Sequence, residues 1–145
     1  MTRLVTDRRA TGGLARQFAS FGLVGAFGFA VDATLFLLLS GHFRWPIATA
    51  RGSSALCAIT ATWALNRQLT FARRKSPRRS TEFLRYVLVQ IGGLVVNLGV
   101  FAFALWVAPP LRSTPIVALA LGAAAALLFN FASARTLAFR GSEGG

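Results

Sequence analysis

A cationic segment at residues 66–79 reads NRQLTFARRKSPRR and lies between two long apolar stretches of the chain. A lysine or arginine at the centre of a bilayer costs about 2.5–3.5 kcal/mol on insertion scales, so this segment cannot lie in hydrocarbon. The stretches on either side are almost free of charged residues and favour burial in lipid. The sequence therefore predicts a membrane protein in which this basic segment is a loop at one membrane surface.

The apolar stretches are long enough for four membrane-spanning helices. A helix needs roughly 20 mainly apolar residues to cross the bilayer core. Of the 145 residues, 54% are hydrophobic and only 14% are charged, which is unlike a soluble domain of this size. We therefore predict an all-α membrane protein without a separate soluble domain. The predicted spans are residues 18–40, 46–65, 85–107 and 115–134.

Lysine and arginine are distributed unequally between the two predicted sides of the membrane. They gather before the first span, in the central loop and after the fourth span, whereas the two short connections hold few. Cytoplasmic loops carry the excess of these residues. We therefore expect a multi-pass protein of the cytoplasmic (inner) membrane with both termini in the cytoplasm. Its parts would be a basic tail at residues 1–17, a four-helix transmembrane domain at residues 18–139 and a second tail at residues 140–145.

The net charge of +12 indicates anionic membrane lipids as partners. In a soluble protein this charge would suggest nucleic acid, but four spans leave no surface with which to read it. Basic residues beside spans attract anionic headgroups instead. We expect no nucleic-acid partner.

The two halves of the chain form an internal repeat. Residues 21–32 align with residues 86–97, and residues 62–71 align with residues 130–139. Each half would be a helical hairpin that begins and ends in the cytoplasm, so the two repeats are predicted to be parallel. Small residues also recur at four-residue spacing in three of the spans. That spacing indicates close helix packing within the bundle, or the seam of a homo-oligomer.

The first predicted span carries a carboxylate at Asp32, about fourteen residues from its start. An ionisable residue at this depth usually faces the bundle interior and marks a substrate path, a proton relay or an ion pair. The other interpretation is a protonated side chain that only joins helices by a hydrogen bond. Arg51 is the candidate partner. The aligned residue in the second half is Asn97, so the two halves are chemically unequal.

An arginine ends each of the second and fourth spans, Arg67 and Arg135, with an asparagine nearby, Asn66 or Asn130. Arginine binds phosphate in a bidentate manner and asparagine adds donors, so two such corners at the headgroup level would suit a lipid phosphate. Helix-dipole compensation and snorkelling explain the arginines equally well. Together with Asp32 and Asn97, these four residues are the predicted substrate-binding set.

The sequence contains no recognisable catalytic constellation. It has no nucleophile–histidine pair, no acidic dyad and no cluster of histidine and cysteine residues with metal-ligand spacing. We therefore expect no enzymatic activity, no catalytic residue, no metal and no cofactor.

Two motifs carry a family resemblance. They are the first-span pattern at residues 18–25 that leads to Asp32, and the corner at residues 66–71, which has a weaker echo at residues 130–139. On these residues the chain resembles the GtrA family of small four-span membrane proteins. It departs from the family pattern at Leu69, where an aromatic residue is usual, and at Ala134, where asparagine is frequent.

The resemblance implies a role in the synthesis of cell-surface polysaccharides or glycolipids. Members are proposed to flip polyprenyl-phosphate-linked sugars across the cytoplasmic membrane, or to support the glycosyltransferases that make or use them. Translocation of a lipid-linked sugar is therefore the expected function. A membrane anchor that recruits a glycosyltransferase partner and transports nothing is the first alternative. A small multidrug-type exporter, which also has four spans and a first-helix carboxylate, is the second.

Overall fold

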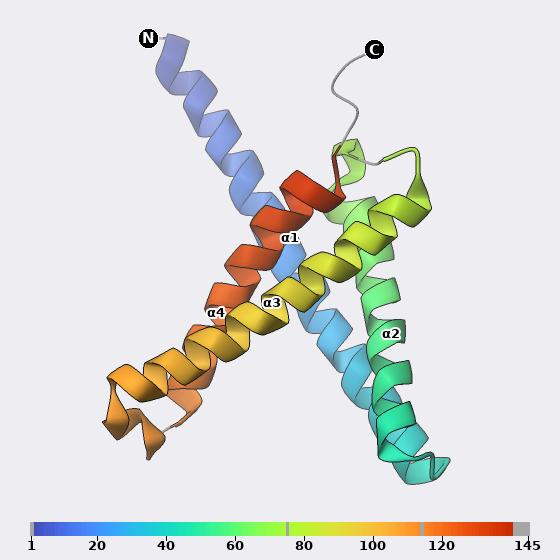
Figure 1. Cartoon of the computed structure of the whole chain (residues 1–145). Coiled ribbons are helices and arrows are strands. Elements are labelled where there is room, and N and C mark those ends of the chain that lie inside the picture. Colours follow the sequence, from blue (N-terminus) through green and yellow to red (C-terminus); the bar gives the residue numbers. More distant parts are fainter. Residues whose placement is uncertain (1, 75, 114, 141–145) are drawn as a thin grey trace. The chain divides into compact units, whose positions relative to one another are not determined.

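The computed structural model describes residues 2–74, 76–113 and 115–140, and these residues form helices and short connections without a strand. The all-α prediction is confirmed for this part of the chain. Short π-helical or 3₁₀ turns follow or link the long helices. The α-helices are α1 (Thr2–Leu37), α2 (Ile47–Leu65), α3 (Arg79–Val107) and α4 (Pro115–Ser133), shown in Figure 1.

Of the eight predicted span boundaries, three coincide with helix ends, three lie within three residues of one and two lie further away. α2 ends at Leu65, α3 ends at Val107 and α4 begins at Pro115, as predicted. α1 begins at Thr2 rather than near Phe18, and α3 begins at Arg79 rather than near Arg85. The reason is that charged and small polar residues end an apolar window but do not end a helix, and the segments concerned lack proline.

Among the residues that the structure describes, three segments are long and apolar enough to cross a membrane: Gly13–His42, Arg79–Val107 and Pro115–Ala138. Their large apolar side chains are widely exposed, as for Phe29 (74%) and Leu23 (73%) on α1, which suits contact with lipid rather than water. α2 is not among the three, since Arg51 and several serine and threonine residues lower its mean hydropathy. A fourth span through α2 stays a prediction.

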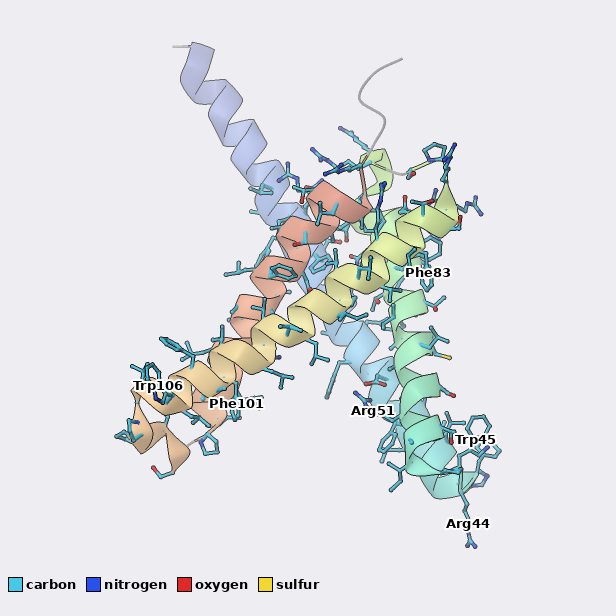
Figure 2. The ribbon with its side chains drawn as sticks, viewed as in Figure 1. Arg44, Trp45, Arg51, Phe83, Phe101 and Trp106 are labelled. Atoms are coloured by element: carbon cyan, nitrogen blue, oxygen red, sulfur yellow. The ribbon has the colours of Figure 1, made fainter. Side chains whose placement is uncertain are left out.

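The chain divides into two compact units, unit 1 (residues 1–75) and unit 2 (residues 76–145). In unit 1, α1 packs against α2; in unit 2, α3 packs against α4 (Figure 1). Trp45 lies in the connection between α1 and α2, and Trp106 lies at the end of α3 (Figure 2). Each unit is therefore a pair of packed helices.

Small residues line the packing face in both units. In unit 1 the buried residues of α2 are spaced four apart, and in unit 2 the buried small residues of α4 follow the same spacing. A Cβ atom added at Gly28 of α1 would collide with the Thr62 side chain of α2, and one added at Gly93 of α3 would collide with the Asn130 side chain of α4. The predicted close packing of small residues is confirmed for α2 and α4. It is wrong for the series Gly22, Ala26 and Ala30 in α1, because Ala26 and Ala30 are exposed and a Cβ atom at Gly22 would meet nothing within 4 Å. The buried small residues are Ala50, Ser54, Ala58 and Thr62 in α2, and Ala118, Gly122 and Ala126 in α4.

The internal repeat is matched by equal local structure in the two units. Each second helix runs into a π-helical turn, η2 (Asn66–Thr70) in unit 1 and η5 (Ala134–Ala138) in unit 2. The residue after each turn is a buried phenylalanine. Phe71 makes an edge-on contact with Phe21 at 6.1 Å between ring centroids, and Phe139 makes the same contact with Tyr86 at 5.9 Å. The aligned aromatic residues thus hold the corner of each unit in the same way.

Candidate functional site

An ion pair joins α1 and α2 inside unit 1. Nη1 of Arg51 donates to Oδ2 of Asp32 at 2.5 Å, and the Ser54 hydroxyl donates to Oδ1 at 2.7 Å. The Asp32 side chain is 16% exposed, whereas the Arg51 side chain is 58% exposed. Arg51 lies toward the end of unit 1 that carries Trp45, in the connection between α1 and α2 (Figure 2). The predicted pairing of Asp32 with Arg51 is confirmed.

The cluster pairs the Asp32 carboxylate with a cation and a hydroxyl. Both carboxylate oxygens accept a hydrogen bond from a donor on α2, and one of these donors is a cation. Pairing of this kind lowers the cost of a charge in an apolar region. The Arg51 guanidinium also lies 5.9 Å from the centroid of the Phe36 ring. Because a guanidinium has five N–H donors, it can contact a further acceptor without leaving Asp32.

The equivalent place in unit 2 is uncharged. Asn97 aligns with Asp32, and Gly122 occupies the position of Ser54. A Cβ atom at Gly122 would lie 2.7 Å from both the carbonyl oxygen and Oδ1 of Asn97, so the asparagine packs directly on α4. The two units therefore present a charged site and a neutral one, as the sequence predicts.

A chain of hydrogen bonds fills the corner of unit 1 between α1 and η2. The Thr70 hydroxyl donates to Oδ1 of Asn66 at 2.9 Å, so the contact of 2.9 Å between the Ser20 and Thr70 hydroxyls has Ser20 as its donor. Asn66 is only 1% exposed. The structure thus places Asn66 inside the corner, where it orients Thr70, and leaves the adjacent Arg67 partly exposed.

We expect the hydroxyl and amide of this corner to stabilise the fold as a unit. Removing the hydroxyl in Thr70→Ala leaves a buried acceptor on Asn66 without this donor, which costs about 1–3 kcal/mol. The double variant Asn66→Ala, Thr70→Ala removes both partners and reproduces the alanines of η5. Its loss of unfolding free energy in detergent should be smaller than the sum of the two single losses. Additive losses would contradict a coupled corner.

The corner of unit 2 lacks this chain. Ala134 and Ala138 stand at the positions of Asn66 and Thr70, and both are fully buried. Asn130 lies more than one turn before Arg135 and packs on Gly93, with its Oδ1 buried and without a hydrogen-bond partner among the described residues. The structure therefore gives Asn130 a place between α3 and α4 and leaves Arg135 partly exposed in η5.

Two polar features were missed from the sequence. Glu82 of α3 is fully buried, and its Oε2 accepts a hydrogen bond of 2.7 Å from the backbone N–H of Ser76. In a chain with only four acidic residues, a glutamate beside a basic loop was a usable signal. A cavity of about 470 Å³ between α1 and η2, lined in part by Arg16 and Gln68, had no such signal.

The comparisons with known proteins agree with this architecture. The model of the GtrA/DPMS transmembrane domain matches residues 20–139, which is most of the chain and includes Asp32, both corners and all the predicted site residues. A comparison with curated proteins gives no match. Because the matched region covers far more than half of the sequence, the chain belongs to the GtrA/DPMS transmembrane-domain family.

Proposed function

We propose that this protein translocates a polyprenyl-phosphate-linked sugar across the cytoplasmic membrane. The family implies a role in glycosyl-lipid or polysaccharide synthesis. The observation that carries the step to translocation is the cluster of Asp32, Arg51 and Ser54 within a pair of lipid-exposed helices. Charged residues within a membrane raise the free energy of insertion, and they commonly mark the path of a polar substrate.

The physical task is to move a polar headgroup through a hydrocarbon layer about 30 Å thick while the prenyl tail stays in lipid. Arg67 and Arg135, at the corners of the two units, would attract the phosphate at the cytoplasmic surface. Asp32, Arg51 and Asn97 would offer polar contacts deeper in the membrane. No covalent bond changes in this process, so the protein would be no enzyme and would need no cofactor.

The anchor alternative rests on a different observation. α1 extends from Thr2, well before the predicted span begins at Phe18, and its first residues include several arginines. A basic helical extension of this kind could hold a glycosyltransferase at the membrane. The exporter alternative is weaker, because both oxygens of Asp32 already accept hydrogen bonds from Arg51 and Ser54.

Arginine variants in reconstituted vesicles test the proposal. We expect Arg67→Ala to reduce the transfer of a lipid-linked sugar about tenfold, because a charge-assisted contact to phosphate is worth about 1.5–3 kcal/mol. Arg73→Gln is the matched control, since Arg73 is exposed in the adjacent turn, and it should keep the transfer rate. Unchanged transfer in Arg67→Ala, with less glycosyltransferase recruited to the vesicles, would favour the anchor. Proton-coupled efflux of cationic drugs that depends on Asp32 would favour the exporter.

A further inference from the structure

We propose that the cavity between α1 and η2 is the binding site for the phosphate-bearing headgroup of the lipid substrate. The proposal rests on the function proposed above and names where that substrate is first held. The cavity has a volume of about 470 Å³ and belongs entirely to unit 1. This volume lies in the range of about 300–1,000 Å³ that is usual for small-molecule sites. Its polar lining residues are Arg16, Gln17, Ser20, Gln68 and Thr70.

The chemistry of the lining suits an anion that also accepts hydrogen bonds. Arg16 is exposed and provides a guanidinium, which binds a phosphate with two parallel N–H contacts. Gln17 and Gln68 add amide donors and acceptors that can contact sugar hydroxyls. Among the described residues that line the cavity, none carries a carboxylate. A phosphate would therefore meet attraction without a competing negative charge.

The position of the cavity suits a lipid rather than a soluble ligand. It lies where the apolar run of α1, which begins near Phe18, is preceded by Arg16 and Gln17, so a spanning helix would leave the hydrocarbon there. Leu69 forms part of its lining and is 65% exposed. A headgroup in the cavity could therefore leave its prenyl chain along the apolar surface of α1. The hydrogen-bonded chain from Ser20 through Thr70 to Asn66 holds one wall in place.

Unit 2 has a different chemistry at the equivalent place. Continuing the repeat alignment along α3 puts Thr81 and the buried Glu82 at the positions of Arg16 and Gln17. Ala138 stands at the position of Thr70. A carboxylate replaces an amide and a methyl group replaces a hydroxyl, while Arg85 stands at the position of Ser20, so unit 2 does not repeat the cavity lining of unit 1.

Binding by the full-length protein in detergent tests the site, with polyprenyl phosphate as the probe and native mass spectrometry as the measurement. We expect Arg16→Gln to weaken binding about tenfold or more. Gly13→Trp adds a bulky ring at the lining of the cavity without removing a polar group. A Cβ atom at Gly13 meets nothing within 4 Å, so the ring can be accommodated, and it should weaken binding to a similar extent. Arg73→Gln should bind as the unaltered protein does. Thermal unfolding shows whether each variant is folded.

Three further probes separate the possible sources of binding. Polyprenol without phosphate should bind at least tenfold more weakly, and equal binding would overturn the proposal. Phosphatidylglycerol that binds as well as the probe, and with the same response to Arg16→Gln, would also overturn it. Displacement of the probe by a soluble sugar phosphate would support a site that recognises the headgroup itself.

Equal binding by Arg16→Gln, Gly13→Trp and the unaltered protein would contradict the site, even if vesicle transfer is intact. Arg16-dependent binding without vesicle transfer would keep the site and contradict translocation.

Discussion

Replacing Asp32 by asparagine is expected to stop the transfer of lipid-linked sugar and to destabilise unit 1. The change removes the negative partner of Arg51 and weakens the acceptor that Ser54 contacts at 2.7 Å. Breaking a fully buried ion pair costs about 3–5 kcal/mol. Because Arg51 is 58% exposed, we expect a smaller loss of about 1–3 kcal/mol in unfolding free energy. Thermal unfolding in detergent measures the stability, and vesicle transfer measures the activity.

The double variant Asp32→Asn, Arg51→Gln separates the two roles of this pair. It leaves no uncompensated charge between the helices, so we expect most of the lost stability to return. The transfer rate should stay at the level of vesicles without protein, because the charged site is gone. If the double variant regains transfer along with stability, the pair only holds α1 against α2, and its proposed contact with substrate is wrong.

Replacing Gly122 by alanine is expected to be the most damaging small change in unit 2. The added Cβ atom would lie 2.7 Å from the backbone carbonyl oxygen of Asn97, which cannot rotate away as a side chain can. α4 must then move away from α3, and overpacking of this kind costs about 1–3 kcal/mol. The measurement is again thermal unfolding in detergent.

Gly99 provides the matched control for this change. It lies on α3, and a Cβ atom there meets nothing within 4 Å. Gly99→Ala should be neutral or slightly stabilising, because alanine favours a helix over glycine by about 1 kcal/mol. Equal destabilisation by both substitutions would mean that Gly122 does not lie at a close contact between the helices.

Much of the fold can be predicted from the sequence because proline and apolar length limit the helices strongly. Pro115 begins α4 and the segment at residues 107–110 ends α3, as predicted. The start of α1 could not be placed in this way, since a basic segment in water is as able to be helical as an apolar one. The mean hydropathy of α2 is too low to mark it as a span, because Arg51 lies within it.

The part of the candidate site that could be predicted from the sequence is the ion pair of Asp32 and Arg51. An aspartate within a span needs a partner, and Arg51 is the basic residue of the neighbouring helix. The burial of Asn66 was not predictable, because it depends on a π-helical turn that folds the side chain inward. The cavity beside Arg16 arises only when η2 packs on α1, so no local pattern in the sequence indicates it.

Transfer by the purified protein in vesicles without a glycosyltransferase is the most direct test of translocation. Lipid-linked sugar is placed in one leaflet, and its appearance in the other is followed over time with an impermeant reagent that reacts with the sugar. The account predicts transfer that rises in proportion to the amount of protein and that falls to the protein-free rate in Asp32→Asn. The result that would contradict translocation is transfer by the unaltered protein that is no faster than in protein-free vesicles. A separate binding measurement should then show that the same protein still recruits a glycosyltransferase.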